Sequence, residues 1–573
     1  MMAIFRAEYR AIFLLLPVAL SLAACSVIPD RGPPARDDTS TAAAPTEPDV
    51  VHWLLVGEMA AKRGDATLAV SSYRRAAEQS DDPDVAKRAT DLAVAAGDLE
   101  TALETAERWS ALSVDNSEAL TALVRLNLGL GRRDQAAEHL RHLVATYADG
   151  PKAALLALPG LLSPYVNQDP ATLSAMDLLR EDYAAYAEYH YALARLAMIA
   201  GDMEAATSAA DEVIRLAPDW YRGQVLEARI LMERGETDAA LKTMATVVAQ
   251  RGDESGLRLE YARMLLQSGQ FGAARVQFEA VLALTPNQPE ALYTMALLSL
   301  DEGLYEDAFD YLTRVLRTGY RRFDAYYHLG VLERERGRLE NALQWFAQVQ
   351  RGDYVVSAQL QIADVLIQMD QMEDARRHLQ ELRDRNPSLQ LPLYVGEGEQ
   401  LIRYGQYDAA FELLTTALAQ FPQERQLRYL RALAAEYVGR LALAEQDLRQ
   451  LIAEDPNDAN ALNALGYMLT VHTERFDEAE ALVMRALELD PENPAIIDSR
   501  GWLAYRRGDL SEAEHYLSQA YGLDSDPEIA AHFGEVLWMR GKKSEAREVW
   551  ERARRDDPDH RVLLETMERF LGP

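Results

Sequence analysis

The hydrophobic residues of the chain recur at helical spacing in pairs of stretches, and a short polar turn separates the two stretches of each pair. In residues 323–356, Tyr326 and Leu329 lie three positions apart in the first stretch, and Ala342 and Phe346 lie four positions apart in the second. Residues with this spacing share one face of an α-helix. The pattern therefore predicts two helices that pack through their apolar faces, and the same unit recurs along most of the chain.

An alanine column sets the period of this unit. Its alanines follow one another at steps of 33 to 35 residues, except for one step of 70 residues between Ala136 and Ala206. A glycine stands five residues before the alanine in twelve of the fourteen cases, and Asp370 and Glu474 replace it in the other two. Glycine reaches the left-handed conformation that ends a helix, and a small alanine lets two helices approach closely. The column alanines are Ala69, Ala102, Ala136, Ala206, Ala240, Ala274, Ala308, Ala342, Ala375, Ala410, Ala444, Ala479, Ala513 and Ala546. The column glycines are Gly64, Gly97, Gly131, Gly201, Gly235, Gly269, Gly303, Gly337, Gly405, Gly439, Gly508 and Gly541.

A period of about 34 residues, with paired helices and in-phase small and aromatic columns, resembles the tetratricopeptide repeat. Gly57, Ala69 and Tyr73 match it in the first repeat, and Trp550 matches it in the last. The resemblance covers residues 50–560. It implies an all-α solenoid, in which antiparallel helix pairs stack into a right-handed superhelix.

The regularity of the columns divides the repeat region into sections. We expect N-terminal repeats over residues 50–150 and the main array over residues 187–560. Residues 151–186 fill the double-length step and are rich in proline and alanine, so we interpret them as a degenerate repeat or a helical insertion. Residues 561–573 are expected to form a capping helix, which covers the last exposed apolar face of the solenoid.

The N-terminal residues have the pattern of a targeting segment. Residues 1–24 place two arginines before a short apolar run, and small residues precede Cys25, the only cysteine of the chain. This arrangement resembles a bacterial lipobox, which implies cleavage before Cys25, acylation of that residue and, with Ser26 after it, attachment to the outer membrane facing the periplasm. An ordinary secretory signal that contains a cysteine is the alternative. Residues 25–49 are rich in proline and predict an extended tether.

Composition and motifs exclude several functional classes. The chain has 59 basic and 91 acidic residues, a formal net charge of -32, so its overall field does not favour nucleic acid. A single cysteine forms neither an internal disulfide nor a cysteine-based metal cluster. We find no His-Glu-x-x-His, Gly-x-Ser-x-Gly or Gly-x-x-x-x-Gly-Lys motif. The sequence therefore favours a binding protein without catalytic residues, metal or cofactor.

Candidate binding residues lie on the first helix of each repeat, which in the tetratricopeptide fold lines the concave groove at repeat positions 2, 5, 9 and 12. Counting from nineteen residues before the column alanine, four successive countable repeats have arginine at position 9. One hypothesis is that these guanidinium groups meet carboxylates on a bound polypeptide. The alternative is that each pairs with an acidic residue of a neighbouring repeat and stabilises the stack. The four residues are Arg125, Arg195, Arg229 and Arg263.

Towards the C-terminus the same stripe becomes aromatic. Tyr467 and Trp502 occupy position 9, and Tyr505 and Trp538 occupy position 12. One hypothesis is that these rings anchor an apolar segment of a partner, as aromatic residues do at many interfaces. The alternative is packing between repeats.

Three C-terminal runs, together with the lipobox, tether and repeat number, resemble the large tetratricopeptide outer-membrane lipoproteins of proteobacteria, in particular the LbcA type. The resemblance implies an adaptor that holds a periplasmic carboxyl-terminal processing protease and delivers peptidoglycan hydrolases to it, with the protease performing the cleavage. The competing interpretation is an assembly lipoprotein for exopolysaccharide export, pilus secretion or outer-membrane protein insertion. The three runs are Leu465-Gly466-Tyr467, Asp498-Ser499-Arg500-Gly501-Trp502 and Tyr505-Arg506-Arg507-Gly508.

Overall fold

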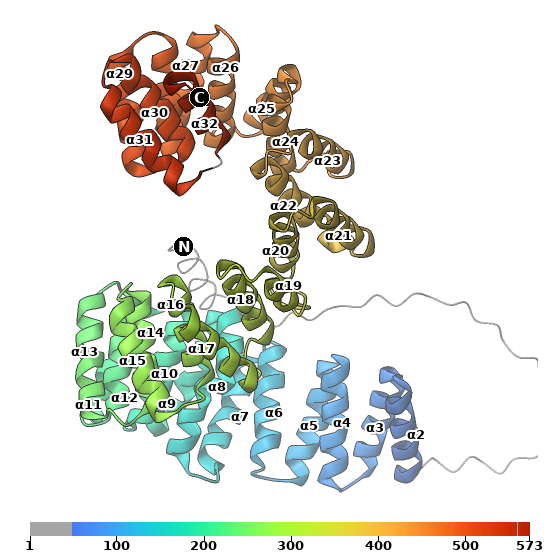
Figure 1. The fold of residues 1–573 in the computed structure, drawn as a ribbon. Helices are drawn as coiled ribbons and strands as arrows, with labels where there is room; N and C mark the ends of the chain where they lie inside the picture. Colours follow the sequence, from blue (N-terminus) through green and yellow to red (C-terminus); the bar gives the residue numbers. More distant parts are fainter. Residues whose placement is uncertain (1–48, 559, 573) are drawn as a thin grey trace, which may run out of the picture. The chain divides into compact units, whose positions relative to one another are not determined.

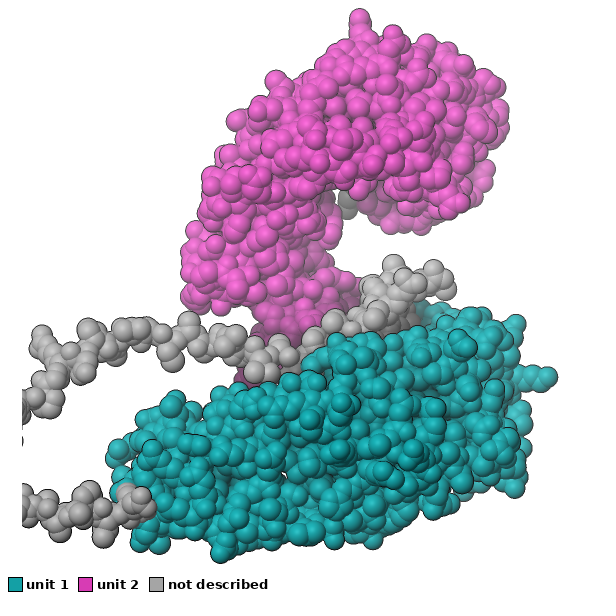
Figure 2. Space-filling view, turned by 180° about the vertical axis from the view of Figure 1, so that it is seen from behind, with its two compact units in different colours: residues 1–304 teal, residues 305–573 magenta. Residues whose placement is uncertain are grey.

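The computed structural model describes residues 49–558 and 560–572, and it divides into two compact units. Unit 1 ends at Leu304 and unit 2 begins at Tyr305 (Figure 2). The predicted signal segment, Cys25 and nearly all of the predicted tether lie outside the described residues. Within the described residues every regular element is a helix, and none of these helices combines the length and apolar content needed to cross a membrane.

The helices of unit 1 follow one another as antiparallel neighbours, and Figure 1 shows them side by side from blue to green. They are α2 (Val50–Arg63), α3 (Ala66–Gln79), α4 (Pro83–Ala96), α5 (Leu99–Leu112), α6 (Ser117–Gly129), α7 (Arg133–Thr146), α8 (Pro151–Gln168), the 3-10 helix η1 (Pro170–Met176), α9 (Asp177–Tyr183), α10 (Ala187–Ala200), α11 (Met203–Leu216), α12 (Tyr221–Glu233), α13 (Thr237–Gln250), α14 (Ser255–Gln267), α15 (Phe271–Leu284) and α16 (Pro289–Asp301).

Unit 2 continues the same alternation of first and second helices. Its elements are α17 (Tyr305–Thr318), α18 (Arg322–Glu335), α19 (Leu339–Phe346), α20 (Val355–Gln368), α21 (Met372–Arg385), the 3-10 helix η2 (Pro387–Leu389), α22 (Gln390–Arg403), α23 (Tyr407–Gln420), α24 (Arg425–Tyr437), α25 (Leu441–Glu454), α26 (Ala459–His472), α27 (Phe476–Leu489), α28 (Pro494–Arg506), α29 (Leu510–Leu523), α30 (Pro527–Met539), α31 (Lys543–Asp556) and α32 (Arg561–Leu571).

The turn inside each repeat follows from the glycine column. All twelve column glycines have a positive φ, between 68° and 90°. At Gly64 this conformation directs the backbone N–H at the carbonyls of Ala60 and Ala61, while the Asp65 carboxylate accepts a hydrogen bond from the backbone of Leu68 and so caps the next helix. Asp370 adopts a φ of 62° in place of glycine. The two helices of a repeat are thus joined with few unsatisfied backbone groups.

The alanine column lies where the two helices of a repeat approach each other. Its fourteen alanines are between 0 and 2% exposed. A Cβ atom at Gly330 would lie 2.5 Å from the ring of Phe346, and one at Gly534 would lie 2.1 Å from Nε1 of Trp550, so no larger residue fits there without a shift. The predicted solenoid of antiparallel helix pairs is therefore confirmed.

Residues 151–186 form helices although they contain prolines. Pro159 and Pro164 lie inside α8, which is followed by η1 and α9. Leu155 of α8 is fully buried and belongs to the same apolar cluster as Leu196 of α10. The core of unit 1 therefore runs through this segment without interruption.

Candidate polypeptide-binding site

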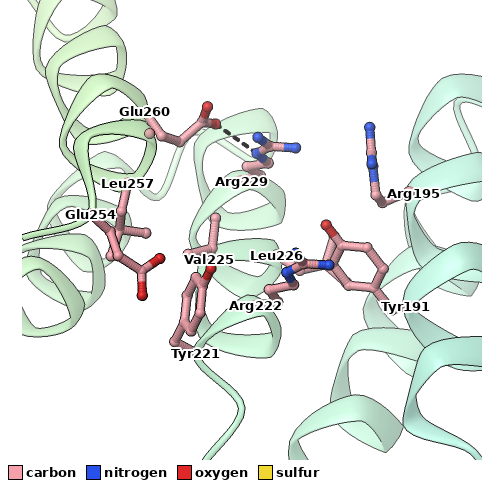
Figure 3. A pocket seen from close by; sticks show the side chains of 11 residues that line it. Tyr191, Arg195, Tyr221, Arg222, Val225, Leu226, Arg229, Glu254, Leu257 and Glu260 are labelled. Atoms are coloured by element: carbon pink, nitrogen blue, oxygen red, sulfur yellow. Dashed lines mark hydrogen bonds and ion pairs between the residues drawn. The ribbon is translucent and has the colours of Figure 1, made fainter. Parts of the chain in front are cut away.

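The first helices of three successive repeats in unit 1 frame a hollow of about 350 Å³. Figure 3 shows that its side chains come from α10, α12 and the start of α14. We call it the arginine hollow. It is lined by Tyr191, Arg195, Tyr221, Arg222, Val225, Leu226, Arg229, Glu254, Gly256, Leu257 and Glu260.

Helical spacing explains why these side chains share one hollow. Tyr191 and Arg195 lie four residues apart on α10, and Arg222 and Arg229 lie seven residues apart on α12, so each pair projects from one stripe of its helix. Leu226 is buried between them and gives the hollow an apolar floor. The arrangement therefore presents charged groups above an apolar surface.

Two of the four predicted arginines are part of an ion-pair ladder. Nε of Arg229 donates to Oε1 of Glu260 over 2.6 Å, and Glu260 also accepts from Nη1 of Arg263 at 3.2 Å. Arg263 in turn donates to Glu290 at the start of α16. For Arg229 and Arg263 the structure thus shows the stack-stabilising contacts that the sequence left as the alternative.

Arg195 forms no ion pair within the described residues, and neither does Arg222, which the sequence analysis did not single out. The guanidinium carbon of Arg195 lies 5.8 Å from the centre of the Tyr191 ring, and that of Arg222 lies 6.0 Å from the centre of the Trp220 ring. Arg222 occupies position 2 of its repeat, so the complete inward stripe, rather than position 9 alone, would have identified it.

The charges around the arginine hollow are asymmetric. On the α14 side, Glu254 pairs with Arg251 at 3.2 Å, and Glu260 belongs to the ladder. On the α10 and α12 side, the charges of Arg195 and Arg222 are not balanced by any carboxylate of the described residues within 4.0 Å. The excess charge of the hollow is therefore positive, in a chain whose net charge is -32.

The fourth predicted arginine lies elsewhere. Arg125 of α6 is exposed and does not line the arginine hollow. Its closest recorded influence is on Tyr165 of α8: burial raises the pKa of that phenol, and the positive charge of Arg125 opposes the change. The position 9 arginines therefore do not form one continuous basic surface.

The aromatic stripe of unit 2 is engaged with its own repeats. The Tyr467 hydroxyl donates to Oε1 of Glu528 over 3.0 Å, and it lies 3.4 Å from Nε2 of His532. Trp502 stacks on the His532 ring with the centres 4.0 Å apart. Because one complete repeat lies between α26 and α30, the contacts of Tyr467 connect repeats that are not neighbours in sequence.

The two position 12 rings are also engaged. The Tyr505 hydroxyl donates to Glu535 over 2.8 Å, and burial together with this hydrogen bond raises the pKa of Tyr505 to about 12. Trp538 stacks against Trp550 and lies against Phe570, with ring centres 5.9 and 6.0 Å apart. The structure thus shows inter-repeat packing for all four predicted rings, and their contact with a partner stays a prediction.

A buried acid–base pair, which the sequence analysis missed, lies at the centre of this stripe. His532 and Asp498 are each 5% exposed, and Nδ1 of His532 lies 2.9 Å from Oδ2 of Asp498. Burial alone would lower the pKa of His532, but the charge and hydrogen bond of Asp498, with the charges of Glu528 and Glu535, raise it. Neither residue belongs to a repeat column, so only the three-dimensional structure reveals the pair.

Comparison with known proteins agrees with this architecture. Three family models, all described as tetratricopeptide repeat, match several parts of the chain. The chain is a tetratricopeptide-repeat protein. The matched segments are residues 231–298, 293–354, 357–388, 429–494 and 499–561.

Two curated relatives share part of the repeat array. A TPR repeat-containing protein of Pseudomonas aeruginosa is 41% identical over 184 residues, which are 32% of this chain and 31% of that protein. A human protein named as the protein O-mannosyl-transferase TMTC1 is 25% identical over 171 residues, 28% of this chain and 19% of that protein. The chain spans less than a third of the length of either relative.

Two solved structures are also similar. A thermophilic tetratricopeptide-repeat protein from Thermus thermophilus has 25% identity and a TM-score of 0.29, over 31% of this chain and 95% of that one. Yeast Tom70 has 16% identity and a TM-score of 0.35, over 91% of this chain and 99% of that one.

Tetratricopeptide arrays are in general protein-interaction scaffolds rather than catalysts, and the arrangement of this chain is of that kind. Within residues 49–558 and 560–572, no group of three or more histidine, cysteine, aspartate or glutamate side chains is placed to hold a metal ion. What the arginine hollow offers is recognition: guanidinium donors, tyrosine rings and an apolar floor on one inward stripe. These are groups that bind a polypeptide without transforming it.

Proposed function

We propose that this chain is a lipid-anchored scaffold that grips other proteins through its inward helices, with carboxylate groups of a partner entering the arginine hollow. The observation that carries the proposal is the pair of guanidinium groups, Arg195 and Arg222, that line one hollow without an ion-pair partner among the described residues. In a chain with 91 acidic residues, an arginine has many possible internal partners. Two that remain without one in the same hollow favour an external anion.

A carboxylate matches this hollow in geometry as well as charge. Figure 3 shows the guanidinium groups of Arg195 and Arg229 facing the same space from α10 and α12. Arg229 binds Glu260 through Nε, so the far side of its guanidinium group stays directed at the hollow. Planar guanidinium groups bind carboxylates through paired N–H donors, and such charge-assisted hydrogen bonds are about twice as strong as neutral ones.

The finer role that we propose is that of an adaptor. Anchored through Cys25 to the outer membrane and facing the periplasm, the chain would hold a carboxyl-terminal processing protease and present peptidoglycan hydrolases to it for degradation. The lipobox-like N-terminus and the C-terminal runs support this role. Two proteins bound to one tethered scaffold meet at an effective concentration far above their bulk values, which is the physical benefit of such an adaptor.

Affinity capture from envelope extract tests the proposal. The full-length lipidated chain is compared with the Arg195→Glu, Arg222→Glu double variant, and we expect the wild type to recover a serine processing protease together with wall hydrolases. The variant should lose at least one of these partners, because it places two carboxylates in the hollow. Recovery of export, pilus or membrane-insertion subunits instead would overturn the adaptor role.

A matched control separates the hollow from the net charge. Arg215 and Arg385 pair with glutamates of their own helices, and their side chains are 63% and 72% exposed. An Arg215→Glu, Arg385→Glu variant changes the net charge by the same amount outside the hollow and should keep its partners. If both double variants lose partners equally, or if neither does, the arginine hollow is not the binding site.

A further inference from the structure

A second hollow, of about 430 Å³, lies beside the ends of α8, α10, α11 and α12. We call it the tryptophan hollow. Trp220 and Tyr186 contribute its rings, while Lys152 and Glu188 form an ion pair of 3.3 Å at it. The remaining lining is small or aliphatic, which makes this hollow less charged than the arginine hollow. The lining residues are Lys152, Ala185, Tyr186, Ala187, Glu188, Leu216, Ala217 and Trp220.

The two rings of this hollow stand where other repeats place a helix cap. Tyr186 is the N-cap residue of α10 and Trp220 is the N-cap residue of α12, and neither side chain makes a capping hydrogen bond. In α2, α4, α6, α26, α28 and α30 the same place holds an aspartate or asparagine that accepts a backbone hydrogen bond. An aromatic side chain cannot cap a helix in this way. Two successive repeats thus lack a stabilising cap and instead direct rings at one hollow.

The tryptophan hollow is continuous with the arginine hollow. The rings of Trp220 and Tyr191 are in contact with their centres 5.3 Å apart, and Arg222 also lies against Trp220. Glu188, Tyr191 and Arg195 occupy positions 2, 5 and 9 of one helix, so a single stripe of α10 passes from the tryptophan hollow to the arginine hollow. A ligand in extended conformation can therefore contact both.

Trp220 also retains an unused polar group. Its indole N–H has no hydrogen-bond partner among the described residues, although the ring is partly buried against the apolar cluster around Val213 and Leu226. A tryptophan at an interface typically combines apolar contact area with such a donor. The hollow therefore offers a ring face, a donor and an aliphatic wall to one side chain.

We infer that the tryptophan hollow is a second subsite of the same polypeptide groove, and that it takes an aromatic side chain of the segment whose carboxylate enters the arginine hollow. The inference rests on the proposed function, because it assigns the ligand of the same surface. It makes the recognised feature a two-point one: an acidic group and an aromatic ring separated by a few residues. The ring stacks on Trp220, and the acidic group meets Arg195 and Arg222.

Blocked peptides measure the two points separately. The probes are acetylated, amidated peptides with one aspartate and one phenylalanine separated by one to five glycines, and binding to the full chain is followed by fluorescence anisotropy. At the best spacing, replacing phenylalanine by alanine should weaken binding about two- to tenfold, the range for one aromatic pair. Replacing aspartate by asparagine reports on the arginine hollow alone.

A protein variant that restores the cap removes the subsite without removing stability. Trp220→Asn places at the N-cap of α12 the residue type that caps α6 and α28. We expect an unchanged or higher melting temperature and a loss of discrimination between the phenylalanine and alanine peptides. Glu424→Asp at the uncapped start of α24 is the matched control, and it should retain that discrimination.

The outcomes separate this inference from the proposed function. If the asparagine peptide binds as well as the aspartate peptide, the carboxylate role of the arginine hollow fails. If only the aspartate matters and the phenylalanine does not, at every spacing, the tryptophan hollow is not a subsite. Equal discrimination by wild type and Trp220→Asn also overturns the inference, because the phenylalanine then binds elsewhere.

Discussion

The arginine stripe of unit 1 and the aromatic stripe of unit 2 occupy the same repeat positions but are used differently. In unit 1, Arg195 and Arg222 line an open hollow without ion-pair partners among the described residues. In unit 2, Tyr467 and Trp502 both contact His532 of a later repeat. An inward position thus does not by itself make a binding residue. What distinguishes the two stripes is whether the array already satisfies the side chain.

The strongest test of this comparison is removal of the buried acid that fixes the aromatic stripe. Asp498→Ala leaves His532 buried without its carboxylate, and breaking a buried pair in this way costs about 3 kcal/mol. We expect a clear fall in the urea midpoint of unit 2 at pH 6, with Asp498→Asn less affected because it keeps an acceptor. A change below about 0.5 kcal/mol would show that the stripe is not held by this pair.

Acid sensitivity distinguishes two buried histidines of unit 2. Burial, with the charge of Arg321, lowers the pKa of His328 to about 3, so the folded protein keeps it neutral. Its contribution to stability is present above about pH 6.5 and is lost as the pH falls, at up to about 1.4 kcal/mol per pH unit. The pKa of His532 is raised, so its contribution is present below about pH 6.5 and is lost as the pH rises through the folded pKa.

Urea unfolding at pH values from about 5 to about 8 separates these opposite contributions. Relative to wild type, His328→Gln should flatten the acid side of the stability profile, and His532→Gln should flatten the side above about pH 6.5. If both variants change the same side, the assignment of protonation states is wrong for one of them.

Breaking the ion-pair ladder of unit 1 should have a smaller effect. Glu260→Ala removes the carboxylate shared by Arg229 and Arg263, whose side chains are 35% and 32% exposed, so we expect a loss of about 1 kcal/mol. The melting temperature is the measurement, and about 0.5 M salt should reduce the difference. A salt-independent loss would point to packing of the Glu260 side chain rather than to its charge.

The smallest expected effect is the most informative about function. Arg195→Gln and Arg222→Gln remove guanidinium groups that have no ion pair among the described residues, so each should change the free energy of unfolding by less than about 0.5 kcal/mol. Chemical unfolding of each variant checks this. A larger loss would place these arginines with Arg229 and Arg263, as stabilisers of the stack, and would remove the contrast between the two stripes.

The repeat architecture was predictable because its causes are local. Glycine at the turn and alanine at the close helix contact act within one repeat, and the structure places the column glycines in the left-handed region and the column alanines in the core. Asp370 shows how far the rule extends, because it takes the glycine conformation at a non-glycine residue. Glu474 does not: α26 ends at an extended Thr473, where the one extra residue of that repeat is accommodated.

The candidate site was only partly predictable, because its causes are not local. Position 9 identified Arg195, but whether an arginine is paired depends on residues about 30 positions away, as with Glu260 for Arg229. Arg222 was missed because only position 9 was followed along the stripe. Trp220 and Tyr186 carry a signal that was present in the sequence, since both interrupt a series of capping residues, but its meaning needed the hollow that they share.

The prolines inside α8 have a mechanical consequence. A proline has no N–H for the carbonyl four residues earlier, so Pro159 and Pro164 leave α8 with two fewer helix hydrogen bonds than a regular helix of its length. Because α8 lies in the chain between α7 and α10, any pull on the N-terminal repeats reaches the hollows through it. Under tension α8 should lengthen first, so that it acts as a built-in spring while the groove behind it keeps its shape.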